Sequence, residues 1–220
     1  MSRIGQIFTI GSGVGRMSAM EGLRAYAAGI VYLLHMVSSF AYHRTGVSFG
    51  ELSVAEVAQI EPAFVPLYWI YRSQYGVDIF FLLSGYLIAG LVIKQHFNYL
   101  VFLYHRFLRI YPTLIITTMA YVAYSLVTEG GSFWLGGVLG NLLLLNGVPG
   151  YGFPPINIVT WSLFFEFAFY FSFPVLWKLC RGKLGVFLVL ALLIIGPLVT
   201  LHDSYIRFLM FIAGVVLKVA

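Results

Sequence analysis

Long apolar segments, separated by short polar ones, constrain the fold of this chain more than any other feature of its sequence. A helix needs roughly 20 residues to cross a hydrocarbon core. The segments of about that length are residues 23–42, 75–93, 110–127, 158–177 and 184–201, and a sixth, 205–219, is shorter. Only 10% of the 220 residues are charged, against about a quarter in soluble domains. The sequence therefore predicts an all-α fold, a polytopic transmembrane helical bundle with about six to seven membrane segments.

One further apolar segment, FWLGGVLGNLLLLNG at residues 133–147, is ambiguous. As a helix it would reach only about 22 Å, short of a core of roughly 30 Å. It is therefore either re-entrant or a short span. If it does not cross and the amino terminus is inside, only Arg44, Arg72 and Arg207 among the basic residues lie outside. This bias of Lys and Arg towards the cytoplasm favours the re-entrant alternative.

The charge and the cysteine content exclude some classes of function. The formal net charge of +5 is typical of membrane proteins with basic cytoplasmic loops, so no nucleic-acid partner is expected. Cys180 is the one cysteine of the sequence, so the chain can form neither an internal disulfide nor a cysteine metal cluster. We expect residues 1–22 to be a cytoplasmic leader and residues 23–220 to be the transmembrane domain.

The first candidate site residues lie in the stretch LRAYAAGIVYLLH at residues 23–35. Eleven residues of helix separate Arg24 from His35, which is about 20° of rotation after three full turns, so the two side chains share a face. Arg24 lies at the inner boundary, where an arginine either anchors the helix or binds phosphate. His35 lies near mid-depth, where an ionisable group marks a site or makes an interhelical hydrogen bond.

A carboxylate occupies a comparable depth in a later span. Glu166 lies near the middle of residues 158–177, and Ser162 lies one turn before it on the same face. An unpaired carboxylate would cost several kcal/mol in hydrocarbon, so Glu166 is expected to be neutral, paired or in contact with water. His35 is the available partner at similar depth, in either a catalytic or a purely structural pair.

Two other stretches carry polar residues at helical spacing. In GVDIFFLLSGYL, Asp78 lies at a helix start, where the helix dipole favours it, and Ser84 with Gly85 leaves room for close approach of another helix or a ligand. The segment FNYLVFLYHRFLR at residues 97–109 predicts a helix in the headgroup plane, with Pro112 in the first turn of the next span. Arg106 and Arg109 share a face of that helix, either as anchors or as ligands for an anionic phosphate.

Together these stretches resemble the acyltransferase-3 family of integral membrane proteins. The matching motifs, in the family's order, are RAYAAGIVYLLH, GVDIFFLLSGYLI, FLYHRFLRIYP, WSLFFE and RFLMFIAGVVL. The resemblance implies transfer of an acyl group, usually acetyl from acetyl-CoA on the cytoplasmic side, to a hydroxyl of a sugar or other acceptor reached from the far side. It also implies a bacterial inner membrane location with the amino terminus in the cytoplasm.

The resemblance also assigns roles, which we state as hypotheses. Catalysis would fall to His35, as general base or transient acyl carrier, with Glu166 orienting it. Donor phosphates would be bound by Arg24, Arg106 and Arg109. The supporting residues would be Asp78, Ser84, Trp161 and Ser162. Acyl-CoA is expected as a co-substrate, and neither a metal nor a bound cofactor is implied.

Three expectations remain open at this stage. Members of the family usually carry more spans than this chain, so the last spans are expected to be absent. The chain is then a fragment, a truncated gene product or a reduced form in which a homo-oligomer or another partner supplies the missing helices. The family's usual span count also favours crossing of residues 133–147, against the charge distribution. Finally, intramembrane His and Glu residues also build proton relays, so a proton-coupled transporter and an inactive remnant are the alternatives to an enzyme.

Overall fold

The computed structural model describes residues 13–46, 52–72, 75–94, 96–128, 135–148, 156 and 160–220. The α-helices are α1 (Gly13–Thr45), α2 (Val54–Ile60), α3 (Val65–Arg72), α4 (Tyr75–Val92), α5 (Tyr99–Thr128), α6 (Leu135–Leu142), α7 (Thr160–Leu179), α8 (Leu184–Leu201) and α9 (Phe208–Val219). Short 3-10 turns are η2 (Pro62–Phe64), η3 (Leu145–Gly147) and η4 (Asp203–Arg207). No β-strand occurs in these ranges, so the predicted all-α fold is confirmed.

Four of the described helices are long and apolar enough to cross a membrane. They contain the candidate spans Ala19–Arg44, Tyr75–Val92, Tyr99–Val127 and Leu184–Leu201. These helices include the predicted segments 23–42, 110–127 and 184–201 and nearly all of 75–93. The helix α7 has 20 residues but includes Glu166 and several hydroxyl-bearing side chains, and α9 has 12 residues. Length and composition therefore support an integral membrane protein but do not by themselves class α7 and α9 as spans.

The chain divides into two compact units, residues 1–83 and 84–220, with the boundary inside α4. In the first unit α1 packs against α3. A small core of Ala41, Val57, Phe64 and Tyr68 joins the end of α1 to the segment that follows it. A capping box begins α2, because Ser53 accepts from the Glu56 amide while Glu56 accepts from the Ser53 amide. The connection between α1 and α4 thus contains two short helices, α2 and α3.

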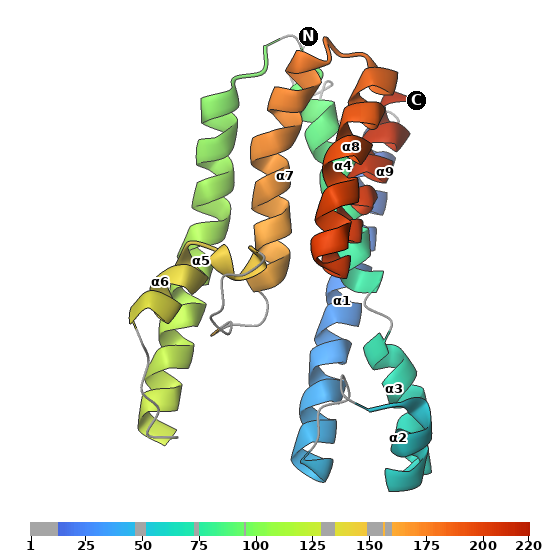
Figure 1. Ribbon diagram of the computed structural model, residues 1–220, viewed down its shortest axis with the longest axis vertical. Coiled ribbons are helices and arrows are strands. Elements are labelled where there is room, and N and C mark those ends of the chain that lie inside the picture. The colour runs from blue at the N-terminus through green and yellow to red at the C-terminus, as the bar shows by residue number, and fades with distance from the viewer. Residues whose placement is uncertain are drawn as a thin grey trace, which may run out of the picture. The chain divides into compact units, whose positions relative to one another are not determined.

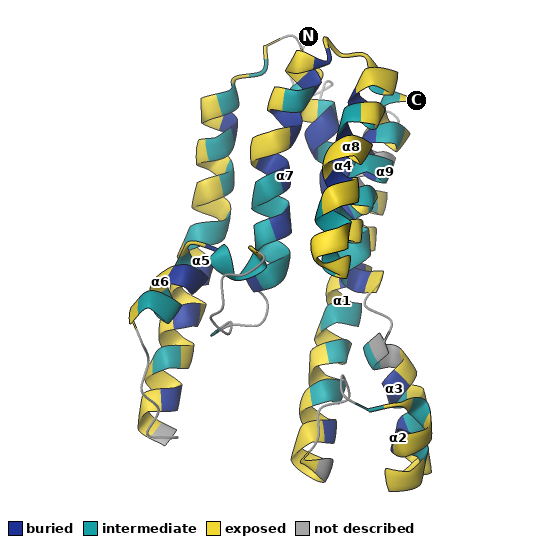
Figure 2. Ribbon diagram, in the orientation of Figure 1, coloured by how far each residue is buried: buried dark blue, intermediate teal, exposed yellow. Residues whose placement is uncertain are grey.

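In the second unit the helices alternate in direction. The helices α5 and α8 run one way, and α7 and α9 run the other way (Figure 1). Aromatic side chains fill the interface of α7 with α8 and α9: Phe169 stacks on Phe211 at 4.5 Å between ring centroids, and Phe173 meets Phe187 edge-on at 5.4 Å. Figure 2 shows buried or half-buried residues along α7, whereas α8 is mostly exposed. Apart from Thr200, the exposed side chains of α8 are apolar, as expected of a surface that faces lipid.

The described part of the ambiguous apolar segment, residues 135–147, does not carry the chain across this unit. Because α5 and α7 run in opposite directions, α5 ends and α7 begins at the same end (Figure 1). Between them, α6 has eight residues, which reach only about 12 Å. Leu144 follows in the left-handed region, with φ at 59°, and turns the backbone into η3. The described part of this segment therefore agrees with the non-crossing alternative.

The predicted surface helix at residues 97–109 is wrong as a separate element. The helix α5 runs without interruption from Tyr99 to Thr128, with Pro112 in its interior. A proline removes one backbone hydrogen bond, but an otherwise apolar membrane helix tolerates that loss. Thirty residues span about 45 Å, more than the roughly 30 Å core, so the first part of α5 can extend beyond the hydrocarbon.

Candidate functional site

The carboxylate of Glu166 lies at the centre of a polar cluster between α4 and α7. Its Oε1 atom accepts a hydrogen bond from Ser84 Oγ at 3.1 Å. The same atom accepts a short hydrogen bond from the hydroxyl of Tyr170, one turn further along α7. Ser84 and Tyr170 are buried, whereas Glu166 is half-buried. The polar environment predicted for Glu166 is therefore present, and the structure supplies two partners for it.

Arg106 of α5 borders this cluster. Its guanidinium lies 5.3 Å from the centroid of the Phe102 ring and 5.3 Å from that of the Tyr170 ring. The two rings meet edge-to-face, at 5.8 Å between their centroids. Both aromatic faces attract the cation by the cation–π interaction. Arg106 is therefore held beside the residue that donates to Glu166.

A basic cavity of about 490 Å³ lies where α4 ends and α5 begins. Its charged and titratable walls are Lys94, His96, His105, Arg106 and Arg109, and Phe97 and Phe102 contribute aromatic surface. Arg106 and Arg109, which the sequence predicted on one helix face, both line this cavity. Three permanent cations around one cavity favour a multiply charged anion, and guanidinium groups bind phosphate oxygens in pairs.

The basic cavity lies at the end of the second unit where cations gather. Lys94 follows α4, Lys178 ends α7, Lys183 precedes α8 and Lys218 lies in the last turn of α9. The alternating helix directions bring all four to one end (Figure 1). This is the charge asymmetry that the sequence predicted for a segment 133–147 that does not cross.

Arg24, His35 and Asp78 belong to the first unit. Arg24 and His35 lie on the continuous helix α1, so their eleven-residue spacing places them on one face as predicted. Arg24 is half-buried and His35 is exposed in the described structure. Asp78 lies in the first turn of α4, as expected from the helix dipole. The pairing of His35 with Glu166 stays a prediction.

The small residues predicted to allow close approach do so. A Cβ atom placed on Gly85 would lie 2.1 Å from the carbonyl oxygen of Phe211, so α4 and α9 touch through backbone atoms. At the start of α7, the guanidinium carbon of Arg207 lies over the ring of Trp161, at 5.4 Å from the centroid of that ring. Ser162 precedes Glu166 by one turn on α7 and is half-buried.

The sequence analysis did not identify Tyr170 or three of the residues that line the basic cavity. Tyr170 follows Glu166 by four residues, so helical spacing alone would have placed it on the same face. The three cavity residues are Lys94 after the end of α4, His96 in the connection and His105 in α5. Only the turn between α4 and α5 brings them together. Spacing along one helix carries no information about such a turn.

A second polar cluster was also missed. Asn141 of α6 is fully buried and donates from Nδ2 to Thr118 Oγ1 of α5 at 3.1 Å, while its Oδ1 accepts from Thr160 Oγ1 of α7 at 3.1 Å. Asn146 donates to the same Oδ1 atom at 3.4 Å. This network attaches α6 to both neighbouring helices.

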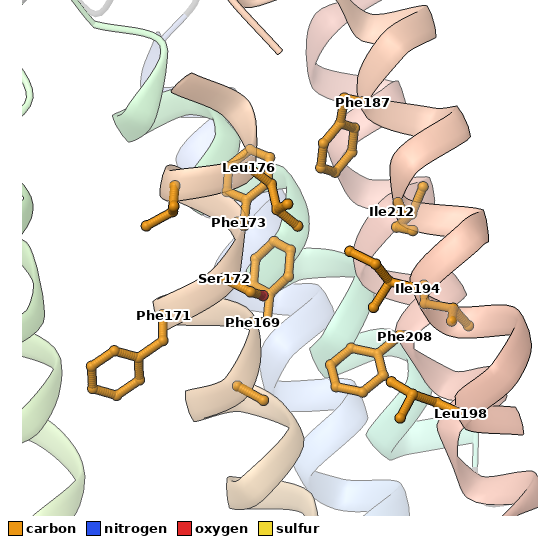
Figure 3. Close-up of a pocket in the computed structure, with 14 residues that line it drawn as sticks. Phe169, Phe171, Ser172, Phe173, Leu176, Phe187, Ile194, Leu198, Phe208 and Ile212 are labelled. Carbon is orange, nitrogen blue, oxygen red and sulfur yellow. The ribbon is translucent and has the colours of Figure 1, made fainter. Parts of the chain in front are cut away.

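An apolar cavity of the second unit lies between α7, α8 and α9. It has a volume of about 470 Å³. Figure 3 shows Phe169, Phe173 and Leu176 of α7, Phe187, Ile194 and Leu198 of α8, and Phe208 and Ile212 of α9 around it, with Ser172 as a polar side chain. No charged residue lines this cavity.

Comparison with known proteins gives the following matches. Residues 17–219 match the acyltransferase-3 family model, described as an acyltransferase domain. The acyltransferase MdmB of Streptomyces mycarofaciens is 30% identical over 177 residues, which make up 76% of this chain and 41% of that protein. The chain thus spans about two fifths of the length of this relative. No solved structure matches.

Proposed function

Since the chain belongs to the acyltransferase-3 family of integral membrane proteins, we propose that it transfers an acyl group from acyl-CoA to a hydroxyl of a sugar or glycan acceptor. The acyl group is acetyl in the simplest form of this proposal. The observation that carries it is the contact between the basic cavity and the Glu166 cluster, made by Arg106 over the ring of Tyr170. An anion site and a carboxylate joined in this way suit a phosphate-bearing donor whose reactive end must reach a proton-transfer site.

In this proposal the cavity binds the phosphates of the donor. Arg106 and Arg109 contribute paired N–H donors, and Lys94 adds a third cation. The ring of Phe97 offers a surface on which a nucleotide base can stack. Arg24, at the start of the membrane-spanning part of α1, is proposed to bind the same donor.

In the proposed reaction the acyl group moves from the sulfur of CoA to the hydroxyl oxygen of the acceptor. His35 takes the proton of the acceptor hydroxyl as that oxygen attacks the thioester carbonyl, and the C–S bond then breaks as the new ester forms. The imidazolium returns the proton to the leaving thiolate, which restores neutral His35 and releases free CoA. Glu166 orients the imidazole and stabilises its charged form. An acyl-imidazole intermediate on His35 is the alternative route.

The proposed orientation in the membrane is supported by the positions of the cations. The end of the second unit that carries the basic cavity is proposed to face the cytoplasm, because Lys and Arg gather on that side and acyl-CoA is made there. The membrane is then proposed to be the bacterial inner membrane, with the amino terminus in the cytoplasm. The acceptor would be reached from the opposite side.

The test is acyl transfer by purified protein. Wild type, Glu166→Gln, Glu166→Asp and His35→Gln are incubated with radiolabelled acetyl-CoA, with and without a glycan extract. We expect label to enter the extract with wild type, to fall by at least about 100-fold in Glu166→Gln and His35→Gln, and to persist in part in Glu166→Asp. Donor affinity should change little in all three variants.

Other outcomes decide against the proposal. Full transfer by His35→Gln would remove the histidine from the mechanism. Proton-dependent uptake of a solute into vesicles without label transfer would favour a transporter, and the absence of both activities would indicate an inactive chain.

A further inference from the structure

We infer that Tyr170 is a positioning residue that couples the basic cavity to the carboxylate of Glu166. Its hydroxyl donates to Glu166 Oε1, and its ring lies 5.3 Å from the Arg106 guanidinium. One side chain thus contacts both the carboxylate proposed to act in the transfer and a cation proposed to bind the donor. This inference rests on the proposed function, in which both groups serve one reaction.

The hydroxyl of Tyr170 orients the carboxylate. Ser84 and Tyr170 both donate to Oε1, one from α4 and one from α7 itself. Two donors on one oxygen restrict rotation of the carboxyl group. Among the residues that the structure describes, none donates a hydrogen bond to Oε2. In the proposed function, Oε2 is the oxygen that accepts from the His35 imidazole, because a group that orients a histidine must present its acceptor in a fixed direction.

The ring of Tyr170, in contrast to its hydroxyl, contacts Arg106. Together with Phe102 it offers two aromatic faces to the Arg106 guanidinium, at 5.3 Å each. Aromatic faces attract a cation without occupying its N–H groups. Those groups remain for phosphate oxygens in the basic cavity, which Arg106 also lines.

The two contacts are made by different parts of one side chain, so substitution can separate them. Tyr170→Phe keeps the ring under Arg106 and removes the bond to Glu166. Tyr170→Leu removes both. Tyr111→Phe is the matched control, because Tyr111 lies in the same α5–α7 interface, edge-on to Phe167 at 5.6 Å, and its hydroxyl makes no hydrogen bond within the described part of the chain.

The measurements are kcat and KM for radiolabelled acetyl-CoA, direct binding of CoA, and thermal unfolding. We expect Tyr170→Phe to lower kcat by at least about tenfold, because a hydrogen bond to a charged group is lost, while KM and CoA affinity stay within about twofold. Tyr170→Leu should show the same loss in kcat and also weaken CoA binding by about three- to tenfold. Tyr111→Phe should match wild type in all readouts.

Several results would overturn the inference. Wild-type kcat in Tyr170→Phe would show that the hydroxyl has no part in positioning Glu166. Equal losses in kcat, CoA binding and unfolding temperature for Tyr170→Phe and Tyr170→Leu would reduce Tyr170 to a packing residue. If wild type transfers no acyl group, the proposed function fails. The binding assay still tests the role of the ring in that case, because unchanged CoA affinity in Tyr170→Leu contradicts it.

Discussion

Gly85 sets the distance between two helices of the second unit. A Cβ atom at this position would lie 2.1 Å from the Phe211 carbonyl oxygen and 2.8 Å from its carbon, which are backbone atoms that no rotamer change can move. The neighbouring Ser84 donates to Glu166. The contact between α4 and α9 at Gly85 therefore also fixes the place of one donor to the carboxylate.

We predict that Gly85→Ala destabilises the protein by about 1–3 kcal/mol, the usual cost of overpacking. It should also reduce acyl transfer, because α4 must shift and Ser84 moves with it. Thermal unfolding in detergent measures the first effect. Gly196→Ala on α8 is the control, since a Cβ there meets nothing within 4 Å, and alanine should leave stability unchanged or raise it by up to about 1 kcal/mol. Equal unfolding temperatures for the two variants would contradict the close approach.

Among the elements, α6 depends most on polar contacts. It has eight residues, too few to be stable as an isolated helix. Asn141 joins it to Thr118 of α5 and Thr160 of α7 by hydrogen bonds of 3.1 Å each. In an apolar environment such bonds have no competition from water, so the network is the main directional restraint on α6.

We predict that Asn141→Leu destabilises the α5–α6–α7 region by about 1–3 kcal/mol, because buried hydroxyl partners lose their bonds while the volume stays similar. Hydrogen exchange of residues 135–148 should become faster in this variant. Leu139→Ala, on the exposed side of the same helix, should change exchange little. Unchanged exchange in Asn141→Leu would show that apolar packing holds α6.

The sequence predicted these elements unevenly, for physical reasons. Apolar length identified α1, α4, α5 and α8, because the hydrocarbon core imposes a minimum length. Pro112 suggested a helix start, yet α5 continues through it, because an apolar membrane helix tolerates the loss of one backbone hydrogen bond. Glu166 was found from its depth alone. The cluster around Glu166 and the basic cavity depend on turns between helices. The periodicity of a sequence along one helix does not predict such turns.

For the whole molecule, the gathering of cations at one end of the second unit gives a testable topology. Lys183 precedes α8 and His202 follows it, so they lie at opposite ends of a candidate span. Both are exposed. If the basic end faces the cytoplasm, a thiol at position 183 is protected from outside reagents and one at 202 is not.

We predict that, in a Cys180→Ala background, His202→Cys reacts with a membrane-impermeant maleimide in intact spheroplasts, whereas Lys183→Cys reacts only after permeabilisation. The background is needed because Cys180 is the one native cysteine. Labelling at position 183 in intact spheroplasts would invert the proposed orientation and place the basic cavity away from cytoplasmic acyl-CoA.

The basic cavity is proposed to bind the donor and the neighbouring Glu166 cluster to act on it. Binding of radiolabelled acetyl-CoA to the purified variants tests this arrangement. We expect Arg106→Gln and Arg109→Gln each to weaken binding by at least about tenfold, as loss of a charged hydrogen-bonding pair implies, while Glu166→Gln binds like wild type. Arg181→Gln, an exposed cation in the turn between α7 and α8, should also bind like wild type. Unchanged affinity in Arg106→Gln and Arg109→Gln, or an equal loss in Arg181→Gln, would contradict the claim.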